Sequence, residues 1–262
     1  MTVFAGPSIS HEDVQATLEA TCLPPAAQGD VYLASRKRPA VIALIDGVFE
    51  QVPSVWHKEI LWAMTQGIHV YGASSMGALR AAELAVFGME GVGWIYEAYR
   101  DGTLTDDDEV ALVHGPAESG YEPLSEPMVN IRRTLDAAES GAVISSTTAC
   151  GLVGIGKSLF YPDREYARIL RQAHRQGLPV SELEALADWL PQGAVDQKRI
   201  DALILLHVIR ERFEGGVMPK QVDFEFQWTK YWDRLVKGDV TRRPWFDGTE
   251  VTASGQPPLT QP

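Results

Sequence analysis

The chain has 262 residues, 45% hydrophobic and 22% charged, which is enough to bury one sizeable core in a globular fold. Its formal net charge of −12 repels phosphate backbones and anionic lipid, which argues against nucleic acid and membrane partners. Two cysteines without metal-type spacing, no basic leader and no apolar run long enough to span a bilayer predict a cytoplasmic protein without a metal or other cofactor.

The first predicted elements are a short strand over residues 2–5 and a helix over 11–21 that Ser10 can cap. A loop rich in Pro, Ala and Gly follows. The basic cluster Arg36–Arg38 ends this loop. It is interpreted as a solvated turn before the next strand, and the alternative is a docking patch for an acidic partner.

The β-branched run over residues 41–45 is typical of a strand buried on both faces. It is followed by a helix over 54–66, a strand over 68–71 and a helix over 76–87. Residues 41–87 therefore have the order strand, helix, strand, helix, which predicts a right-handed parallel unit.

A further helix is predicted over 92–101, and the acidic run Asp106–Glu109 is interpreted as a solvated turn. The apolar residues Val110–Val113 are predicted to form a fourth strand. The later segments predicted to be helical are 127–140, 144–157, 163–175, 181–190, 197–213 and 219–236.

These elements predict an α/β fold with a parallel sheet core over about residues 2–115 and a helical C-terminal half. We expect one domain over 1–238. Residues 239–262 are rich in Gly, Pro and Thr and are predicted to be a flexible tail.

The sharpest local motif is Gly72-Ala-Ser-Ser-Met-Gly77, which joins a predicted strand to a predicted helix. A serine on such a turn presents its hydroxyl at the carboxyl end of the strand. The spacing Ala-x-Ser75-x-Gly differs by one substitution from a nucleophile elbow, which favours Ser75 over Ser74 as a nucleophile. Two other interpretations stay open: a helix N-cap, and a phosphate site that lacks the lysine of a Walker loop.

An oxyanion could be held by free N–H groups at the start of the helix and by a second donor from Gly47 or Val48. Asp46 and Gly47 end the preceding parallel strand, so they should open on the same edge as the serine turn. The small residues around that turn would let a substrate carbonyl approach the backbone. The residues that this hypothesis places around the oxyanion and the substrate are Asp46, Gly47, Gly72, Ser74, Met76 and Gly77.

A serine nucleophile needs a base, and the start of the helix over 54–66 offers His57 and Lys58. A helical wheel places His57 beside the apolar stripe and Lys58 nearly opposite it, which mildly prefers His57. A lysine acts as a base when desolvation or a nearby cation lowers its pKa, and Arg80 could contribute there. Arg80 could equally bind a carboxylate or thiocarboxylate, or pair with Glu83.

The other reactive side chains carry weaker signals. The six histidines are scattered and His-Glu-x-x-His is absent, so no metal motif is found. Cys150 is interpreted as a small core residue, and a thiol acting in sulfur transfer is the alternative.

Several stretches together resemble the core of the TfuA family over about residues 41–135. The long string Ser-Met-Gly-Ala-Leu-Arg-Ala-Ala-Glu makes the resemblance specific. The stretches that carry it are Leu44–Phe49, Val55–Leu61, Val70–Leu84, Gly88–Gly93, Asp107–His114 and Met128–Arg132.

The resemblance implies a partner, YcaO, an ATP-dependent enzyme that activates a peptide amide during thioamidation of ribosomally made (RiPP) peptides. It implies a hydrolase that releases sulfide from a thiocarboxylated ThiS-type sulfur carrier through a Ser–Lys pair, and that strengthens binding of the peptide substrate by YcaO. Carried onto this chain, the pair is Ser75 and Lys58, against the preference of the wheel for His57. It also allows a topology more unusual than a doubly wound sheet.

Two functions from other classes compete with this hydrolase. One is a non-catalytic adaptor that docks YcaO to its peptide, and the other is a phosphate- or nucleotide-binding module. For partner surfaces, the sequence suggests Arg36–Arg38 as a contact for YcaO and Arg132 with Arg133 as the basic residues nearer the sulfur carrier.

Overall fold

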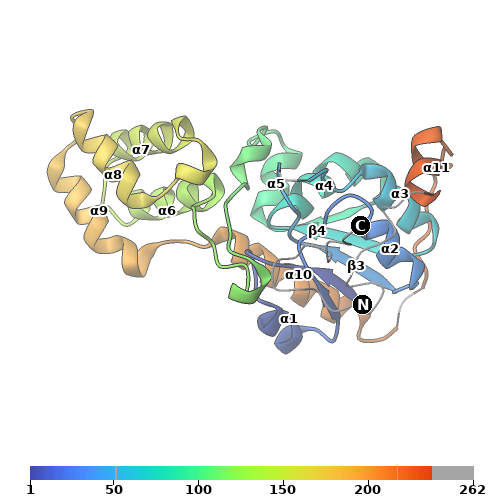
Figure 1. Cartoon of the computed structure of the whole chain (residues 1–262). Helices are drawn as coiled ribbons and strands as arrows, with labels where there is room; N and C mark the ends of the chain where they lie inside the picture. Colours follow the sequence, from blue (N-terminus) through green and yellow to red (C-terminus); the bar gives the residue numbers. More distant parts are fainter. Residues whose placement is uncertain (51, 217, 238–262) are drawn as a thin grey trace, which may run out of the picture.

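The computed structural model describes residues 1–50, 52–216 and 218–237, and it is built around a five-stranded sheet (Figure 1). Neighbouring strands are all parallel, in the order β2-β1-β3-β4-β5. The strands are β1 Thr2–Phe4, β2 Thr21–Leu23, β3 Val41–Leu44, β4 His69–Ala73 and β5 Glu90–Val92. This architecture confirms the predicted α/β class.

Helices surround the sheet, and further helices form a separate lobe beside it (Figure 1). The helices packed around the sheet are α1 His11–Thr17, α2 Asp30–Arg36, α3 His57–Thr65, α4 Met76–Leu84, α5 Trp94–Arg100, α10 Gln197–Phe213 and α11 Lys230–Lys237. The helical lobe consists of α6 Met128–Ser140, α7 Ser146–Ser158, α8 Tyr166–Arg175 and α9 Val180–Gly193. Short 3-10 turns are η1 Ala85–Phe87, η2 Asp107–Glu109, η3 Ala117–Ser119 and η4 Tyr161–Asp163.

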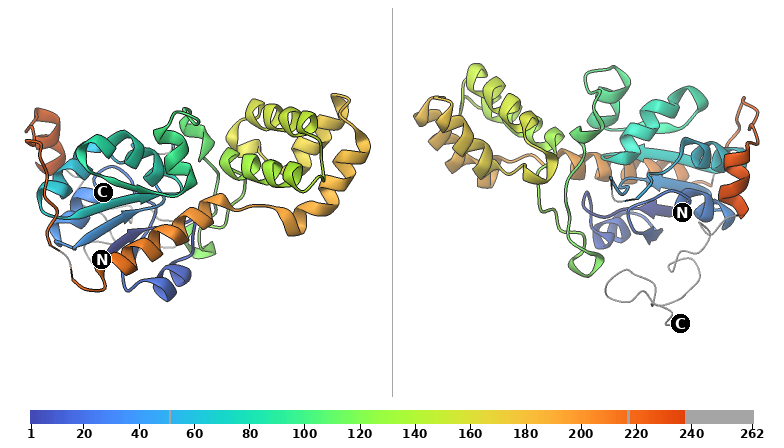
Figure 2. Two further views of the ribbon diagram at one scale, coloured as in Figure 1. Left: turned by 180° about the vertical axis from the view of Figure 1, so that it is seen from behind. Right: turned by 45° about the horizontal axis from the view of Figure 1, so that its top comes forward.

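The centre of the sheet is buried on both faces, and its middle strand β3 is apolar at every position. In β3, Ile42 and Leu44 face the cluster that contains Ile60 of α3. Val41 and Ala43 alternate to the other face, where α10 packs. Figure 2 shows α10 running from the sheet to the helical lobe, so one helix belongs to both parts of the molecule.

The acidic run before the lobe was predicted to be a solvated turn, which holds for the exposed Asp106 and Asp107 but is wrong for Glu109. Glu109 is buried and receives two hydrogen bonds from Arg132, at 2.9 and 2.8 Å. Lys157 and Arg164 of the lobe both pair with Asp108. The run therefore joins the segment before the lobe to the lobe itself, and cations from distant parts of the sequence pair with Asp106, Asp108 and Glu109.

The segment Val110–Val113, predicted to be a strand, lies outside the sheet. Val110 is buried in a cluster with α5 and α6, and the Val113 amide donates to Ser125 Oγ at 2.9 Å. Apolar character alone marked this segment as a strand, and helices supply its burial instead.

Three short elements were missed, and one predicted helix runs too long. The helix predicted over 11–21 ends at Thr17, and residues 21–23 form β2. The predicted loop contains α2, and β5 precedes the helix predicted over 92–101. A three-residue strand offers too few positions for a period to show.

The helix predicted over 219–236 is confirmed only over Lys230–Lys237. Residues before it run across α3 and η1 without helical structure, and Val222, Phe224 and Phe226 pack against the body of the protein. Their spacing of two residues is the period of an extended chain, not of a helix. The predicted flexible tail over 239–262 lies outside the described residues. Within the described part, no helix has the length and apolar character that crossing a bilayer requires.

Glu59, in the first turn of α3, gives the fold a testable pH dependence. Burial raises its pKa from 4.5 to about 7, although the amides of Tyr32 and Trp56 donate to it at 3.2 and 3.1 Å. The folded state thus holds a proton that the unfolded chain has lost. Its stabilising contribution is complete below pH 4.5 and is lost as the pH rises through about 7.

We expect the unfolding free energy to fall more steeply between about pH 5 and pH 8 in the wild type than in Glu59→Gln, by about 2–3 kcal/mol. The amide keeps an oxygen acceptor and removes the titration. Urea unfolding of both proteins at the two pH values measures this difference. Parallel slopes would show that Glu59 does not change protonation over this range.

Candidate functional site

The turn between β4 and α4 is tight and strained. The Ser75 amide donates to the Ala73 carbonyl at 2.8 Å, and Ser74 between them has a φ of 68°. A three-residue turn with a positive φ is a rare form, and such strain is concentrated at functional sites. Ser74 Oγ is fully buried and has no hydrogen-bond partner in the described chain. The turn thus places Ser75 at the start of α4.

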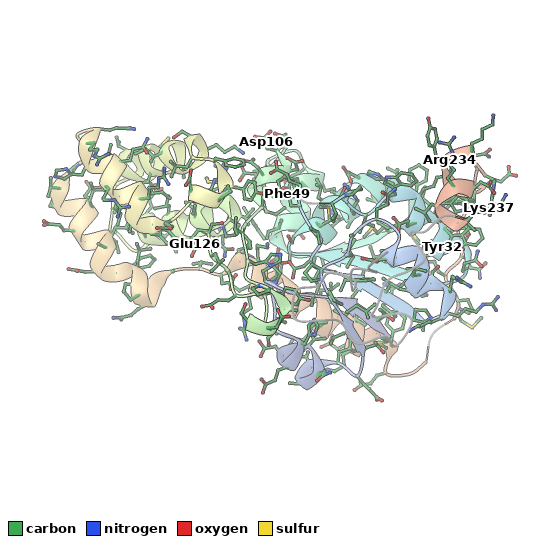
Figure 3. The ribbon with its side chains drawn as sticks, viewed as in Figure 1. Tyr32, Phe49, Asp106, Glu126, Arg234 and Lys237 are labelled. Carbon is green, nitrogen blue, oxygen red and sulfur yellow. The ribbon has the colours of Figure 1, made fainter. Side chains whose placement is uncertain are left out.

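Ser75 opens into a cavity of about 570 Å³ at the carboxyl edge of β3 and β4. The residue is only 7% exposed, and its hydroxyl makes no hydrogen bond with the described part of the chain. Phe49 and Asp106 also line the cavity and lie between the sheet and the helical lobe (Figure 3). The volume is that of a small-ligand site.

Two backbone amides are available beside Ser75. Gly47 and Met76 both line the cavity, and neither amide donates a hydrogen bond to any described residue. The Val48 amide, an expected alternative, donates to the Ala26 carbonyl at 3.0 Å, and that of Gly77 donates to Ile45 at 3.2 Å. The arrangement leaves Gly47 and Met76 to face an oxyanion.

The glycines of the motif serve packing and do not line the cavity. A Cβ on Gly77 would lie 1.7 Å from the Leu44 carbonyl oxygen, and one on Gly72 would lie 2.1 Å from the Gly77 carbonyl oxygen. Glycine at these positions lets α4 approach β3 and β4 closely. Ser74 is likewise placed outside the cavity lining.

Asp46 lines the cavity, but its carboxylate is engaged with the loop after β1. It accepts the amides of Gly6 and Ser8 at 2.9 and 3.0 Å and the Ser8 hydroxyl at 2.6 Å. Its Oδ1 is also 3.9 Å from Lys198 Nζ. Asp46 therefore fixes one wall of the cavity and places a negative charge beside a buried lysine.

The two side chains predicted as bases lie outside the cavity lining. His57 Nε2 is 2.7 Å from Glu83, and both side chains are substantially exposed. Lys58 Nζ donates to the Gln227 carbonyl and lies 5.0 Å from the centre of the Phe226 ring. The geometry does not bring either residue together with Ser75.

Arg80 does line the cavity, with its guanidinium held by neighbours. It donates to the Val55 carbonyl at 2.9 Å, to Glu83 at 2.6 Å and to Ser54 Oγ at 3.1 Å. The pairing with Glu83, one of the sequence alternatives, is confirmed.

Lys198 is the site residue that the sequence analysis missed. It is 2% exposed, lines the same cavity as Ser75, and donates from Nζ to the Val110 carbonyl at 3.0 Å. Burial lowers its pKa, while the nearby carboxylates of Asp46 and Asp196 act in the opposite direction. A lysine whose pKa is lowered by burial can act as a proton acceptor.

The start of α10 holds Lys198 in place. Asp196 caps the helix by accepting the Arg199 amide at 3.0 Å, and Asn130 accepts the Lys198 amide at 3.1 Å. In the structure Lys198 lies on the buried face of the helix together with Ala202 and Leu205. A lysine on a buried stripe is uncommon and indicates a specific role.

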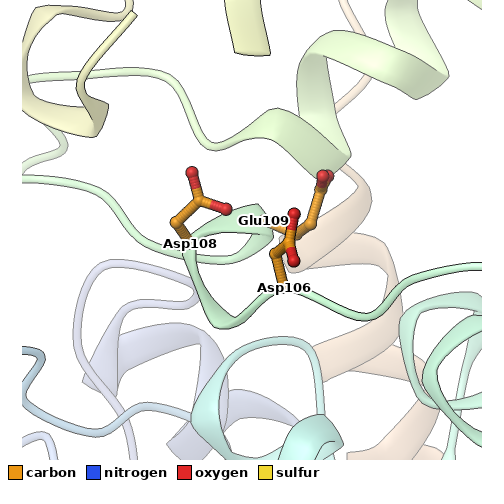
Figure 4. A group of neighbouring side chains, drawn as sticks. All are labelled: Asp106, Asp108 and Glu109. Carbon is orange, nitrogen blue, oxygen red and sulfur yellow. The ribbon is translucent and has the colours of Figure 1, made fainter. Parts of the chain in front are cut away.

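The remaining reactive groups considered from the sequence are the acidic run and Cys150. The carboxylates of Asp106, Asp108 and Glu109 converge (Figure 4), but Lys157 Nζ lies 3.0 Å from Asp106 and 3.1 Å from Glu109. This lysine supplies the positive charge that a metal ion would otherwise provide. Cys150 is exposed on α7, so its interpretation as a core residue is wrong.

The basic residues predicted as partner contacts differ in how exposed they are. Arg132 is bound to Glu109, and Arg133 pairs with Asp136 at 3.3 Å. The cluster Arg36–Arg38 is exposed at the end of α2.

A known protein family matches the part of the sequence that contains the motif and the segment leading into the lobe. The TfuA-like protein family matches residues 46–165, a range that includes Asp46, Ser75 and Arg80. Lys198 lies outside the matched range. A search of the curated proteins finds no match. Over residues 46–165, a range that contains the serine motif, the chain is therefore similar to the TfuA family.

Proposed function

We propose that this protein hydrolyses the thiocarboxylate end of a ThiS-type sulfur-carrier protein and supplies sulfide to a YcaO enzyme, with Ser75 as nucleophile and Lys198 as base. The TfuA family supports an accessory role in thioamidation, and it is associated with YcaO-type partners. The observation that carries the mechanism is that a buried serine hydroxyl without a hydrogen bond shares one cavity with a buried lysine.

The first step balances with these two residues. Neutral Lys198 takes the proton of the Ser75 hydroxyl while Oγ attacks the thiocarboxylate carbon. The amides of Gly47 and Met76 stabilise the tetrahedral oxyanion. When the carbon–sulfur bond breaks, the Lys198 ammonium gives its proton to the departing sulfur, so hydrosulfide leaves and an acyl-serine ester remains.

The second step repeats the same roles with water. Lys198 accepts a proton from water as the water attacks the ester carbonyl, and the ammonium then returns a proton to Ser75 Oγ. The products of the two steps are the carrier carboxylate, hydrosulfide and one proton. The cavity is deep enough that the scissile group must be the end of a chain, which suits the flexible tail of a carrier protein.

Lys198 fits the base better than Lys58 for a physical reason. Lys58 lies outside the cavity lining, with its ammonium over the Phe226 ring. A buried ammonium with incomplete pairing is destabilised, and this is the position of Lys198.

The test is sulfide release by the isolated protein from a thiocarboxylated carrier, without YcaO or ATP. We expect multiple turnovers. A non-catalytic adaptor would release no sulfide and would still increase the affinity of YcaO for its peptide, so titration of YcaO with peptide in the presence of the protein distinguishes the two. No sulfide release above the rate of the uncatalysed reaction would reject the hydrolase.

A further inference from the structure

The cavity that contains Ser75 has opposite charges at its two ends. Lys198 and Arg80 are buried residues of its lining. The exposed residues that line it include several carboxylates: Glu50, Glu83, Asp106 and Asp107. A ligand that fills the cavity therefore passes acidic groups at the surface before it reaches basic groups inside.

Two of these carboxylates are not neutralised by the protein. Glu83 pairs with Arg80, and Asp106 pairs with Lys157. Glu50 accepts a hydrogen bond from the neutral Tyr161 hydroxyl at 3.1 Å. For Asp107, no hydrogen bond or ion pair is found in the described chain. Glu50 and Asp107 thus present net negative charge at the cavity mouth.

Independent evidence marks this cavity as a ligand site. Ser75 is more than nine-tenths buried, its hydroxyl is unpartnered, and it lines the same cavity. The Ser75 hydroxyl is accessible from the cavity, so a ligand there can supply the hydrogen bond that the described chain does not. The acidic mouth and Ser75 are therefore two ends of one binding site.

We propose that Glu50 and Asp107 form a cation subsite that selects a lysine or arginine side chain in the tail of the carrier, a few residues before the end that reaches Ser75. The inference rests on the proposed function, because it assumes that a chain end enters the cavity. The two carboxylates come from different segments, the loop after β3 and η2, and both line the cavity. The net charge of −12 favours approach of a basic tail over an acidic one.

Binding alone can test this subsite, without chemistry. The probes are fluorescent hexapeptides ending in Gly-Gly, with lysine, glutamine or glutamate immediately before the two glycines, measured by anisotropy with the Ser75→Ala protein. We expect the lysine peptide to bind about tenfold more tightly than the glutamate peptide at low salt, because each exposed charge pair contributes modestly. The preference should largely vanish at about 0.5 M salt.

Matched variants assign the effect to the two carboxylates. Glu50→Gln with Asp107→Asn, added to Ser75→Ala, should remove the preference, and Glu50→Lys with Asp107→Lys should reverse it. Glu184→Gln with Asp188→Asn removes two exposed carboxylates from α9, outside the cavity lining, and should leave the preference unchanged.

The outcomes separate this subsite from the proposed hydrolysis. Charge-selective binding without sulfide release would support the subsite and reject the hydrolase. Sulfide release with equal binding of all three peptides would reject the subsite alone. Failure of every peptide to bind would also overturn the subsite.

Discussion

Replacement of Ser75 with alanine is expected to abolish sulfide release, lowering kcat by roughly three to six orders of magnitude. The hydroxyl is the group that would form the acyl-enzyme, and without it the cavity offers only positioning and two amide donors. Sulfide release from a thiocarboxylated carrier, followed over single and multiple turnovers, measures the loss. The fold should be unchanged, because the Ser75 hydroxyl makes no hydrogen bond in the described chain.

Ser74 provides the matched control on the same turn. Its hydroxyl is buried without a partner, so Ser74→Ala removes an unsatisfied group and should cost little activity or stability. Alanine is disfavoured at a φ of 68° just as serine is, so the wild type and the variant carry the same backbone strain. Wild-type turnover by Ser75→Ala, or a dead Ser74→Ala, would move the nucleophile away from Ser75.

Replacement of Lys198 with methionine is expected to reduce kcat about as severely as loss of Ser75, and the double variant should be no worse than either one. The two side chains act as one unit, so their effects do not add. In the wild type, the rate should rise with pH and level off with an apparent pKa below the ~10.4 of a free lysine, because burial lowers the pKa of Lys198. Lys58→Met should retain activity, since Lys58 lies outside the cavity lining.

Stability gives a second measurement for Lys198 that a purely structural role would not satisfy. Burial of an incompletely paired ammonium costs free energy, so Lys198→Met should be at least as stable as the wild type at neutral pH. A lowered pKa in the folded state makes this cost largest at low pH, and it disappears as the pH approaches about 10.4. Thermal unfolding at several pH values tests this. Full activity of Lys198→Met would reject the assignment of Lys198 as the base. A Lys198→Met protein that is unfolded at every pH would reject it as well.

The strand–helix order over residues 41–87 could be predicted because its signals are local. A continuous β-branched run identifies β3, and the motif before α4 marks a turn between a strand and a helix. Helix α10 was likewise predicted with its observed bounds, Gln197–Phe213. Short elements such as β2 and β5 carry no such signal.

The base and the charge network could not be found in the same way, because they depend on contacts between distant residues. Lys198 lines the same cavity as Ser75 although 123 positions of sequence separate them, and one lysine in a charged helix is usually solvated. The acidic run before the lobe is likewise ordinary until Arg132 and Lys157 are placed against it. From composition alone, such charged side chains are expected to be exposed. Only the tertiary structure shows which of them are buried.

The late position of α10 in the chain has a consequence for synthesis on the ribosome. The five strands are complete at Val92, but the helix that covers one sheet face begins only at Gln197. At typical rates of translation, roughly 5–20 s pass between synthesis of the last strand and synthesis of the helix that covers this apolar face. Chaperones that bind extended apolar surface would meet the growing chain during that interval. Any truncation ahead of Gln197 leaves the face open permanently, so premature termination is expected to produce an aggregation-prone polypeptide and not a smaller folded protein.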